Sequence, residues 1–228
     1  MRYPDVVDEP TTIRKALTGR SLARFGDGEI KLMFGRPCIF QEPDPRLQTM
    51  LKQCVRDVFG PCLPCIPRIA SGKSPKESFW AKYRHRDVIG LYEPSRKATY
   101  GSAFISRPDS ASVQIDTPDY WKLVRSLWAG KDVVLVRGSR KSLALDLMMD
   151  AATVDLVKAP AENAFSEFDS LFERLRGEKR RVLLCLGPTA TVLAWKLAQE
   201  GVHALDLGHV GMFMRKGTDN GKGISDAR

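Results

Sequence analysis

The second half of the chain alternates between short apolar runs and segments with helical periodicity. The apolar runs fall at 131–139, 152–160, 180–188 and 202–209, and amphipathic segments of helical length separate them. Runs that are apolar throughout are typical of strands buried on both faces, and strands that alternate with helices predict a parallel sheet. We therefore predict an α/β fold: a single-domain Rossmann-like variant with a mostly parallel sheet and helices on both faces.

The first half gives clearer signals for helix ends than for strands. Asp44 followed by Pro45 predicts a helix start, and Thr117 predicts another before 118–129. Ser74 with Glu77 three residues later forms a capping-box pattern at the start of a helix over 74–86. Strands are expected at 21–26, 62–67, 87–93 and 98–106, and a short helix at 141–150. The expected domain covers 1–215, and 216–228, rich in Gly, Asp and Lys, is expected to be a flexible tail.

The charge of the chain limits its partners only weakly. The net charge is +9 over 228 residues, and the basic residues are spread along the chain with no dense arginine-rich block. A nucleic acid, an anionic membrane surface and a phosphorylated small molecule all remain open as partners, beside a merely solvated basic surface. No run approaches the ~18 apolar residues that span a bilayer. The charged N-terminus lacks the apolar core of a signal peptide, so we expect a cytoplasmic protein.

The five cysteines are expected to be reduced thiols, because the count is odd and no secretory signal is present. Cys62 and Cys65 form a single C-x-x-C. A structural zinc site needs a second pair or suitably spaced histidines, which the sequence lacks. Buried structural thiols are therefore the favoured interpretation.

The stretch RFGDGE, 24–29, carries two carboxylates two residues apart. In an extended backbone Asp27 and Glu29 would point to one side, where like charges repel unless a cation lies between them. Mg²⁺ and Mn²⁺ prefer oxygen ligands and are often held by one or two carboxylates together with substrate phosphates. Gly26 and Gly28 would leave room for a phosphate group. The alternative for the same residues is a polar turn between a strand and a helix.

Two later strand ends also carry polar side chains. Ligands of open α/β sheets bind beyond the carboxyl ends of the strands. The sequence LGPTAT, 186–191, joins a strand to a helix start that suits a phosphate or a sugar hydroxyl, although Thr189 could simply cap that helix. Asp206 and His209 end the last predicted strand, where a lone histidine is commonly a structural group. Neither a Walker sequence nor a dinucleotide-binding glycine motif is present.

Taken together, these segments resemble one family. SLARFGDGE, TYGSAFISRP, DYWKLVRSLWAGKDVVLVRG, APAENAFSEFDSLFERL and RRVLLCLGPTATVLAWKLAQEGVHALDLGHV occur in the order seen in bacterial glycosyltransferases of the GT-D fold type. The likeness covers roughly residues 10 to 215, and its last block is the most specific part.

The resemblance implies transfer of a hexose, typically glucose, from a nucleotide-sugar donor, typically a UDP-sugar. The acceptor would be a glycan of a surface polysaccharide or glycoprotein, such as the glycan on a serine-rich adhesin. In the family a D-x-E motif binds the divalent ion, Mn²⁺ or Mg²⁺, that holds the donor diphosphate, and here this motif falls on Asp27 and Glu29. No nucleic-acid partner is then expected, peripheral contact with the inner face of a membrane is allowed, and the oligomeric state stays open.

The expected site residues follow from this resemblance together with the local patterns. The expected catalytic residues are Asp27, Glu29 and His209, with Asp27 and Glu29 also holding the metal. The residues expected to bind substrate are Arg24, Gly26, Gly28, Asn163, Gly187, Pro188, Thr189 and Asp206.

The sequence departs from the family pattern in two places. Relatives often carry an acidic residue after the Gly-His pair, where this chain has Val210. After the VRG strand they tend to show an Asn-Asp pair, where this chain has SRKSLALDLM. Both departures bear on the choice of donor or acceptor and on the catalytic base, a role for which Asp146 is one candidate.

Two other functions fit the same sequence. One is a non-catalytic basic protein that binds nucleic acid or anionic ligands. Its binding affinity would fall steeply with salt and would not depend on Mn²⁺. A phosphate-ester hydrolase that uses the same carboxylates would release inorganic phosphate without an acceptor.

Overall fold

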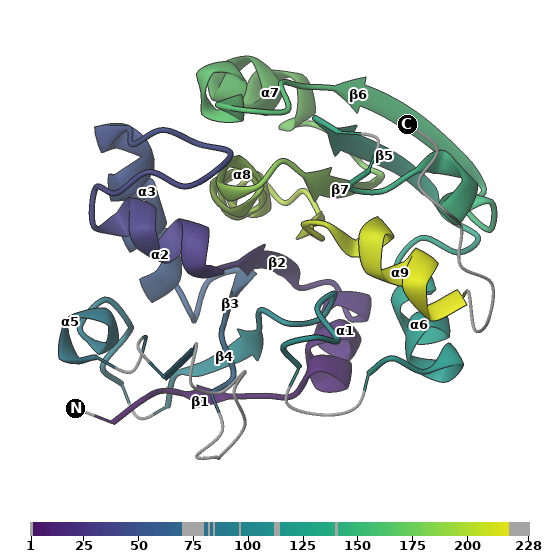
Figure 1. Ribbon diagram of the computed structural model, residues 1–228. Helices are drawn as coiled ribbons and strands as arrows, with labels where there is room; N and C mark the ends of the chain where they lie inside the picture. The colour runs from purple at the N-terminus through teal and green to yellow at the C-terminus, as the bar shows by residue number, and fades with distance from the viewer. Residues whose placement is uncertain are drawn as a thin grey trace.

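A single sheet runs through the molecule, with helices on both of its faces (Figure 1). The computed structural model describes residues 2–218 except 70–79, 82, 84, 96, 112–114 and 140. Within these residues the sheet has eight strands, and all of its strand pairs are parallel. The predicted α/β class is confirmed. The strands are β1 (Asp5–Val6), β2 (Ser21–Arg24), β3 (Cys62–Ile66), β4 (Thr99–Ser102), β5 (Asp132–Arg137), β6 (Thr153–Lys158), β7 (Arg181–Cys185) and β8 (Ala204–Asp206).

The order of the strands places a switch of direction at the centre of the sheet. The order is β1-β4-β3-β2-β8-β7-β5-β6. From β2 the chain adds β3 and then β4 on one side of the sheet. It then crosses to the other side, forms β5 and the edge strand β6, and returns inward through β7 to β8, which lies next to β2. The inward return differs from the 3-2-1-4-5-6 order of dinucleotide-binding sheets, so the sheet is a variant of that plan. Strands β2 and β8 meet where the two halves join, which is the usual ligand position in open α/β sheets.

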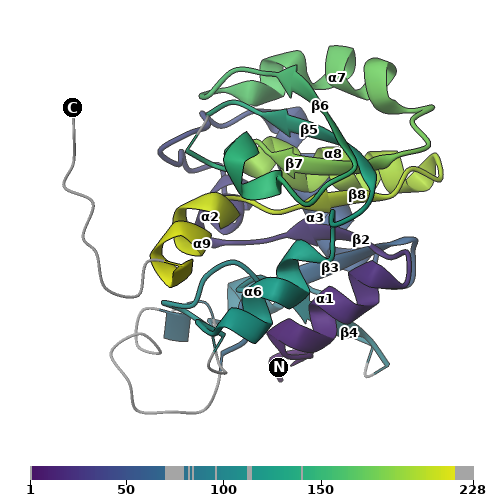
Figure 2. The same cartoon turned by 90° about the vertical axis from the view of Figure 1, so that its right-hand side faces the viewer.

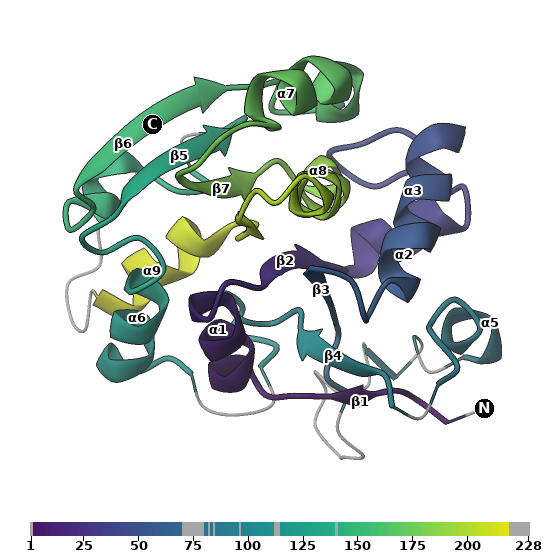
Figure 3. The ribbon, with the colours of Figure 1, turned by 180° about the vertical axis from the view of Figure 1, so that it is seen from behind.

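The helices form two layers. Figures 2 and 3 show α1 and α6 on one face, and α3, α7 and α8 on the other. Each layer closes its own buried cluster, one containing Ile13 and Trp121 and the other containing Leu51 and Leu193. The helices are α1 (Glu9–Leu17), α2 (Asp27–Met33), α3 (Pro45–Arg56), α5 (Arg86–Ile89), α6 (Pro118–Arg125), α7 (Phe168–Leu175), α8 (Pro188–Gln199) and α9 (Val210–Thr218), with 3₁₀ turns η2 (Leu145–Met148) and η3 (Ala164–Glu167).

The predicted helix caps are confirmed where the structure describes them. The Asp44 carboxylate accepts the Leu47 N–H at 2.8 Å and starts α3. The Thr117 hydroxyl oxygen accepts the Tyr120 N–H at 3.2 Å and starts α6. The capping box at Ser74 lies outside the described residues.

Two local predictions need correction, and two elements were not predicted. Residues 87–93, predicted as a strand, contain part of α5, because His85 Nδ1 accepts the Asp87 N–H and starts a helical turn there. Residues 27–33 form α2, so the D-x-E motif lies in a helical first turn and not in an extended backbone. Strand β1 and helix α1, which the apolar pattern did not reveal, precede β2.

The cysteines behave as expected from their count. All five are free thiols, and Cys62 and Cys65 lie fully buried in β3. Burial raises the pKa of both thiols, so they stay protonated and unreactive. Among the described helices, none has the length and apolar character needed to cross a membrane.

The seam between β3, β4 and α1 gives a test of the packing. A Cβ added at Gly101 would lie 2.6 Å from Cys65 Sγ and 3.0 Å from Thr12 Cγ2, with little space for relief. We expect Gly101→Ala to lower the free energy of unfolding by about 1–3 kcal/mol, as overpacking does. Urea unfolding measures this change. Gly177→Ala, where a Cβ meets nothing within 4 Å, is the matched control and should change the stability by less than about 1 kcal/mol. Equal effects of the two substitutions would contradict the packing described.

Candidate functional site

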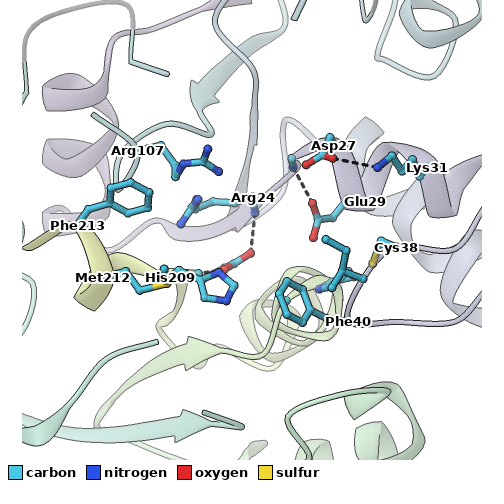
Figure 4. Close-up of a pocket in the computed structure, with 17 residues that line it drawn as sticks. Arg24, Asp27, Glu29, Lys31, Cys38, Phe40, Arg107, His209, Met212 and Phe213 are labelled. Carbon is cyan, nitrogen blue, oxygen red and sulfur yellow. Dashed lines mark hydrogen bonds and ion pairs between the residues drawn. The ribbon is translucent and has the colours of Figure 1, made fainter. Parts of the chain in front are cut away.

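A pocket of about 340 Å³ opens where β2, β7 and β8 end (Figure 4). This is the central switch of the sheet, so the fold places the pocket where ligands of open α/β sheets bind. Nine of the expected site residues line it: Arg24, Gly26, Asp27, Gly28, Glu29, Gly187, Pro188, Asp206 and His209. The strand order has therefore brought residues 24–29 together with 187–188 and 206–209, which lie more than 150 residues later in the sequence.

Helix α2 presents the D-x-E motif to the pocket from its first turn. Residues two apart on a helix do not share a face, yet both side chains line the pocket. The Glu29 Oε2 atom accepts the Gly26 N–H at 2.7 Å, which is the carboxylate half of a capping box. The Asp27 Oδ2 atom accepts from Lys31 Nζ at 3.2 Å, one turn later. Each carboxylate therefore has a partner within the first turns of α2, as the polar alternative to a metal site would require.

A second carboxylate lies behind Glu29. Asp206, at the end of β8, is buried, and its Oδ2 accepts from the Arg24 backbone N–H and the Thr191 hydroxyl, both at 3.1 Å. Burial, and then the charge of Asp206, raise the pKa of Glu29 to about 7. Burial also raises the pKa of Asp206, and Arg24 opposes that shift. The pocket therefore holds acidic groups whose charge is incompletely neutralised by the protein.

Arg24 carries a positive charge that acts on both Glu29 and Asp206. Its Nε donates to the Ala103 carbonyl at 3.0 Å and its Nη1 to Ser106 Oγ at 2.8 Å, so the guanidinium is held in place. A Cβ at Gly208 would lie 2.8 Å from Nη1, and Gly208 has a φ of +55°. Only glycine satisfies both conditions without strain.

His209 lies beside Phe40, with ring centroids 5.5 Å apart. Burial lowers the pKa of His209, and the positive charges of Arg24 and Arg107 lower it further. The imidazole is therefore neutral near neutral pH. A neutral imidazole can accept a proton, so His209 is able to act as a general base as well as a structural group.

Asn163 does not line the pocket but holds a loop that does. Its Oδ1 accepts the Glu42 N–H at 2.8 Å, and its own N–H donates to the Phe40 carbonyl at 2.8 Å. Its φ is +52°, a left-handed conformation that asparagine tolerates better than most residues. Asn163 thus positions the loop that carries Cys38 and Phe40 and is not among the residues that line the pocket.

Thr189 also lies away from the pocket surface. It is fully buried in the first turn of α8, and its hydroxyl finds no hydrogen-bond partner among the described residues. Gly187, with a φ of +56°, is the residue that caps α8, so Thr189 does not take the alternative role of helix cap. Asp146 lies outside the pocket as well, paired with Arg215 at 2.6 Å.

Sequence reasoning missed one wall of the pocket. Figure 4 shows Arg107 beside Arg24, with the ring of Phe213 against it. The guanidinium of Arg107 forms a two-point pair with Asp109, at 2.8 and 2.7 Å, and lies 5.3 Å from the Phe213 centroid. Arg107 sits in the quoted block TYGSAFISRP, but no spacing rule set it apart. The other missed lining residues are Lys31, Cys38, Ile39, Phe40, Gly208, Met212 and Phe213.

The donor set of the pocket suits a hard divalent cation only in part. Carboxylate oxygens are the ligands that Mg²⁺ and Mn²⁺ prefer. Burial, and then repulsion from Asp206, raise the pKa of Glu29, and a cation would relieve that repulsion. In the described part of the chain, however, no cluster of three His, Cys, Asp or Glu side chains could hold a metal. The residues therefore fit an ion that takes its other ligands from water and from a substrate phosphate.

Comparison with known proteins agrees with this geometry. A family model for the glycosyltransferase GT-D fold matches residues 22–213. The chain is 34% identical over 203 residues to the probable glycosyl transferase Gly of Streptococcus gordonii. It is 32% identical over 214 residues to the glycosyltransferase GlyD of Streptococcus pneumoniae serotype 4. These matches cover 84% and 83% of this chain but only 30% and 25% of the relatives, which are much longer.

Solved structures match over nearly the whole chain. The highly conserved domain of unknown function 1792, described as having a distinct glycosyltransferase fold, superposes with a TM-score of 0.83 at 25% identity, covering 99% of this chain and 92% of the other. A glycosyltransferase with the same domain from Streptococcus sanguinis gives a TM-score of 0.82 at 29% identity, covering 93% and 84%. Since the family model spans most of the sequence and the fold agrees, this chain belongs to the GT-D fold family of glycosyltransferases.

Proposed function

We propose that the protein transfers a hexose, typified by glucose, from a nucleotide-sugar donor to a glycan acceptor, with a UDP-sugar as the favoured donor. The observation that supports this most strongly is the pocket at the sheet switch, which combines Arg24 and Arg107 with the half-buried Glu29 and the buried Asp206. In the transfer, the bond between the sugar and the diphosphate breaks and the nucleoside diphosphate leaves with that electron pair. The acceptor hydroxyl forms the new glycosidic bond and loses its proton.

The arginines suit the diphosphate. Arg24 and Arg107 lie side by side on one wall, each fixed by its own partners, and the five N–H groups of a guanidinium match phosphate oxygens. Preorganised cations of this kind stabilise the negative charge of a leaving group. Asp27 and Glu29 would hold a divalent cation, whose chemistry is to neutralise the diphosphate.

His209 is the candidate for the proton acceptor. Its lowered pKa keeps the ring neutral, and it lines the pocket beside Phe40. The acceptor would be a sugar hydroxyl of a surface polysaccharide or glycoprotein, which the resemblance to the family suggests.

The metal is tested through nucleotide binding. We expect Asp27→Asn and Glu29→Gln each to weaken Mn²⁺-dependent UDP binding by at least about tenfold, since even the loss of groups that support metal ligands costs ~10–100-fold. Isothermal titration of UDP with and without Mn²⁺ measures this effect. Asp119→Asn, an exposed change on α6, should bind like wild type. UDP binding that ignores Mn²⁺ and falls steeply with salt would favour a general anion-binding protein instead.

The raised pKa of Glu29 gives a second test without any ligand. An acid with a pKa of about 7 when folded, above its usual 4.5, favours the folded state below about pH 4.5 and loses that contribution as the pH rises through 7. Wild type should therefore lose on the order of 2 kcal/mol relative to Glu29→Gln between these pH values, since each pKa unit corresponds to ~1.4 kcal/mol and the pocket admits solvent. Urea unfolding across this range measures the difference. Parallel pH profiles for the two proteins would show that Glu29 does not titrate as described.

Arg107 gives a third test. Arg107→Gln should weaken UDP binding by about 10–100-fold, which corresponds to the ~1.5–3 kcal/mol of a hydrogen bond to a charged group. Arg176→Gln removes an arginine that is also paired to a carboxylate, but on the exposed end of α7. If both variants bind UDP like wild type, Arg107 does not contact the diphosphate.

A further inference from the structure

A second cavity, also of about 340 Å³, lies between α2 and α5. Lys31, Phe34 and Arg36 line it from the α2 side, and Tyr83, His85 and Asp87 line it from the α5 side. None of these residues belongs to the expected site.

The end of α2 fixes two exposed residues of this cavity, Phe34 and Arg36. The Arg36 N–H donates to the Lys31 carbonyl at 3.0 Å and the Gly35 N–H to the Leu32 carbonyl at 2.9 Å, the paired bonds of a Schellman motif. Gly35 has the required left-handed φ of +70°. The motif turns the chain sharply after Phe34, so the ring and the guanidinium flank the same opening. Phe34 is 43% exposed, which is high for a phenylalanine.

The charges in the cavity leave one cation available. Lys31 pairs with Asp27 at 3.2 Å, and His85 pairs with Asp87 at 3.3 Å. Within the described part of the chain, Arg36 is the lining charge that has no ion pair. An exposed aromatic ring beside an unpaired arginine suits a ligand with an apolar ring face and an anionic substituent.

The cavity adjoins the donor pocket. Lys31 lines both spaces, so the ion pair between Asp27 and Lys31 forms the ridge between them. A ligand here would lie one helix turn from the candidate catalytic groups.

The geometry points to this cavity as the acceptor subsite, holding a sugar residue that carries a phosphate or carboxylate group. The inference rests on the proposed transfer function, since a transferase needs a second substrate beside its donor. Phe34 would pack against the sugar ring, and Arg36 would bind the anionic group.

The test uses simple probes on the full chain, with the donor pocket saturated by UDP and Mn²⁺. Glucose 6-phosphate is the charged probe, methyl glucoside the neutral one, and inorganic phosphate the probe without a ring; saturation-transfer NMR reads their binding. We expect glucose 6-phosphate to bind most tightly and to bind alongside UDP. Arg36→Ala should weaken it by about tenfold, the effect of losing one charged hydrogen bond. Phe34→Ala should weaken both sugars but not inorganic phosphate.

Arg86→Ala is the matched control, because Arg86 is an exposed arginine on α5 that does not line the cavity. Displacement of glucose 6-phosphate by UDP, absence of its binding, or equal effects of the Arg36 and Arg86 substitutions would each overturn the inference. A protein that fails to bind UDP with Mn²⁺ but shows the Arg36 effect would instead contradict the proposed function and leave an anionic-sugar site. Circular dichroism of each variant confirms that it is folded.

Discussion

The seam between β2 and β8 is the constraint on which the pocket depends. These strands join the two halves of the sheet, and their recorded register is a single pairing of Leu22 with Leu205. Side chains replace the missing ladder bonds at both ends. Ser21 Oγ accepts the Ala204 N–H at 2.9 Å at one end, and Asp206 accepts the Arg24 N–H at 3.1 Å at the other. A short seam closed by side chains leaves the strand ends free to diverge, which makes room for a ligand.

The same carboxylate links stability to chemistry. Asp206 also accepts from Thr191 and from the Gly208 N–H, so one side chain organises β2, α8 and the turn that leads to His209. Its charge is one cause of the raised pKa of Glu29. The carboxylate of Asp206 that joins these elements therefore lies close enough to Glu29 to repel it. A bound cation would offset that repulsion.

Regular features could be predicted from the sequence, and features set by long-range packing could not. The parallel sheet and the caps at Asp44 and Thr117 follow from patterns within a few residues. The helical start at Asp27 could not be separated from an extended turn, because glycines around an acidic pair suit both. Short elements such as α5, with four residues, are too short to show a helical period of apolar residues.

The candidate site shows the same division. Side chains near strand ends were found because parallel strands bring their carboxyl ends to one edge. Arg107 and Phe213 were not predicted because only tertiary packing brings them to the pocket. Asn163 was expected to bind substrate from the resemblance, which does not reveal the loop that its side chain holds. Thr189 was expected in the site from the resemblance, but its side chain is buried in the first turn of α8, and Gly187 caps that helix.

The distribution of thiols has a practical consequence. Four of the five cysteines are buried, whereas Cys38 is partly accessible and lies in the pocket wall against Gly28. Burial raises the pKa of Cys38, so it reacts slowly and calls for mildly alkaline conditions. A maleimide fluorophore would thus attach at one position without any engineered cysteine, and its emission would give an optical readout of occupancy in the native chain.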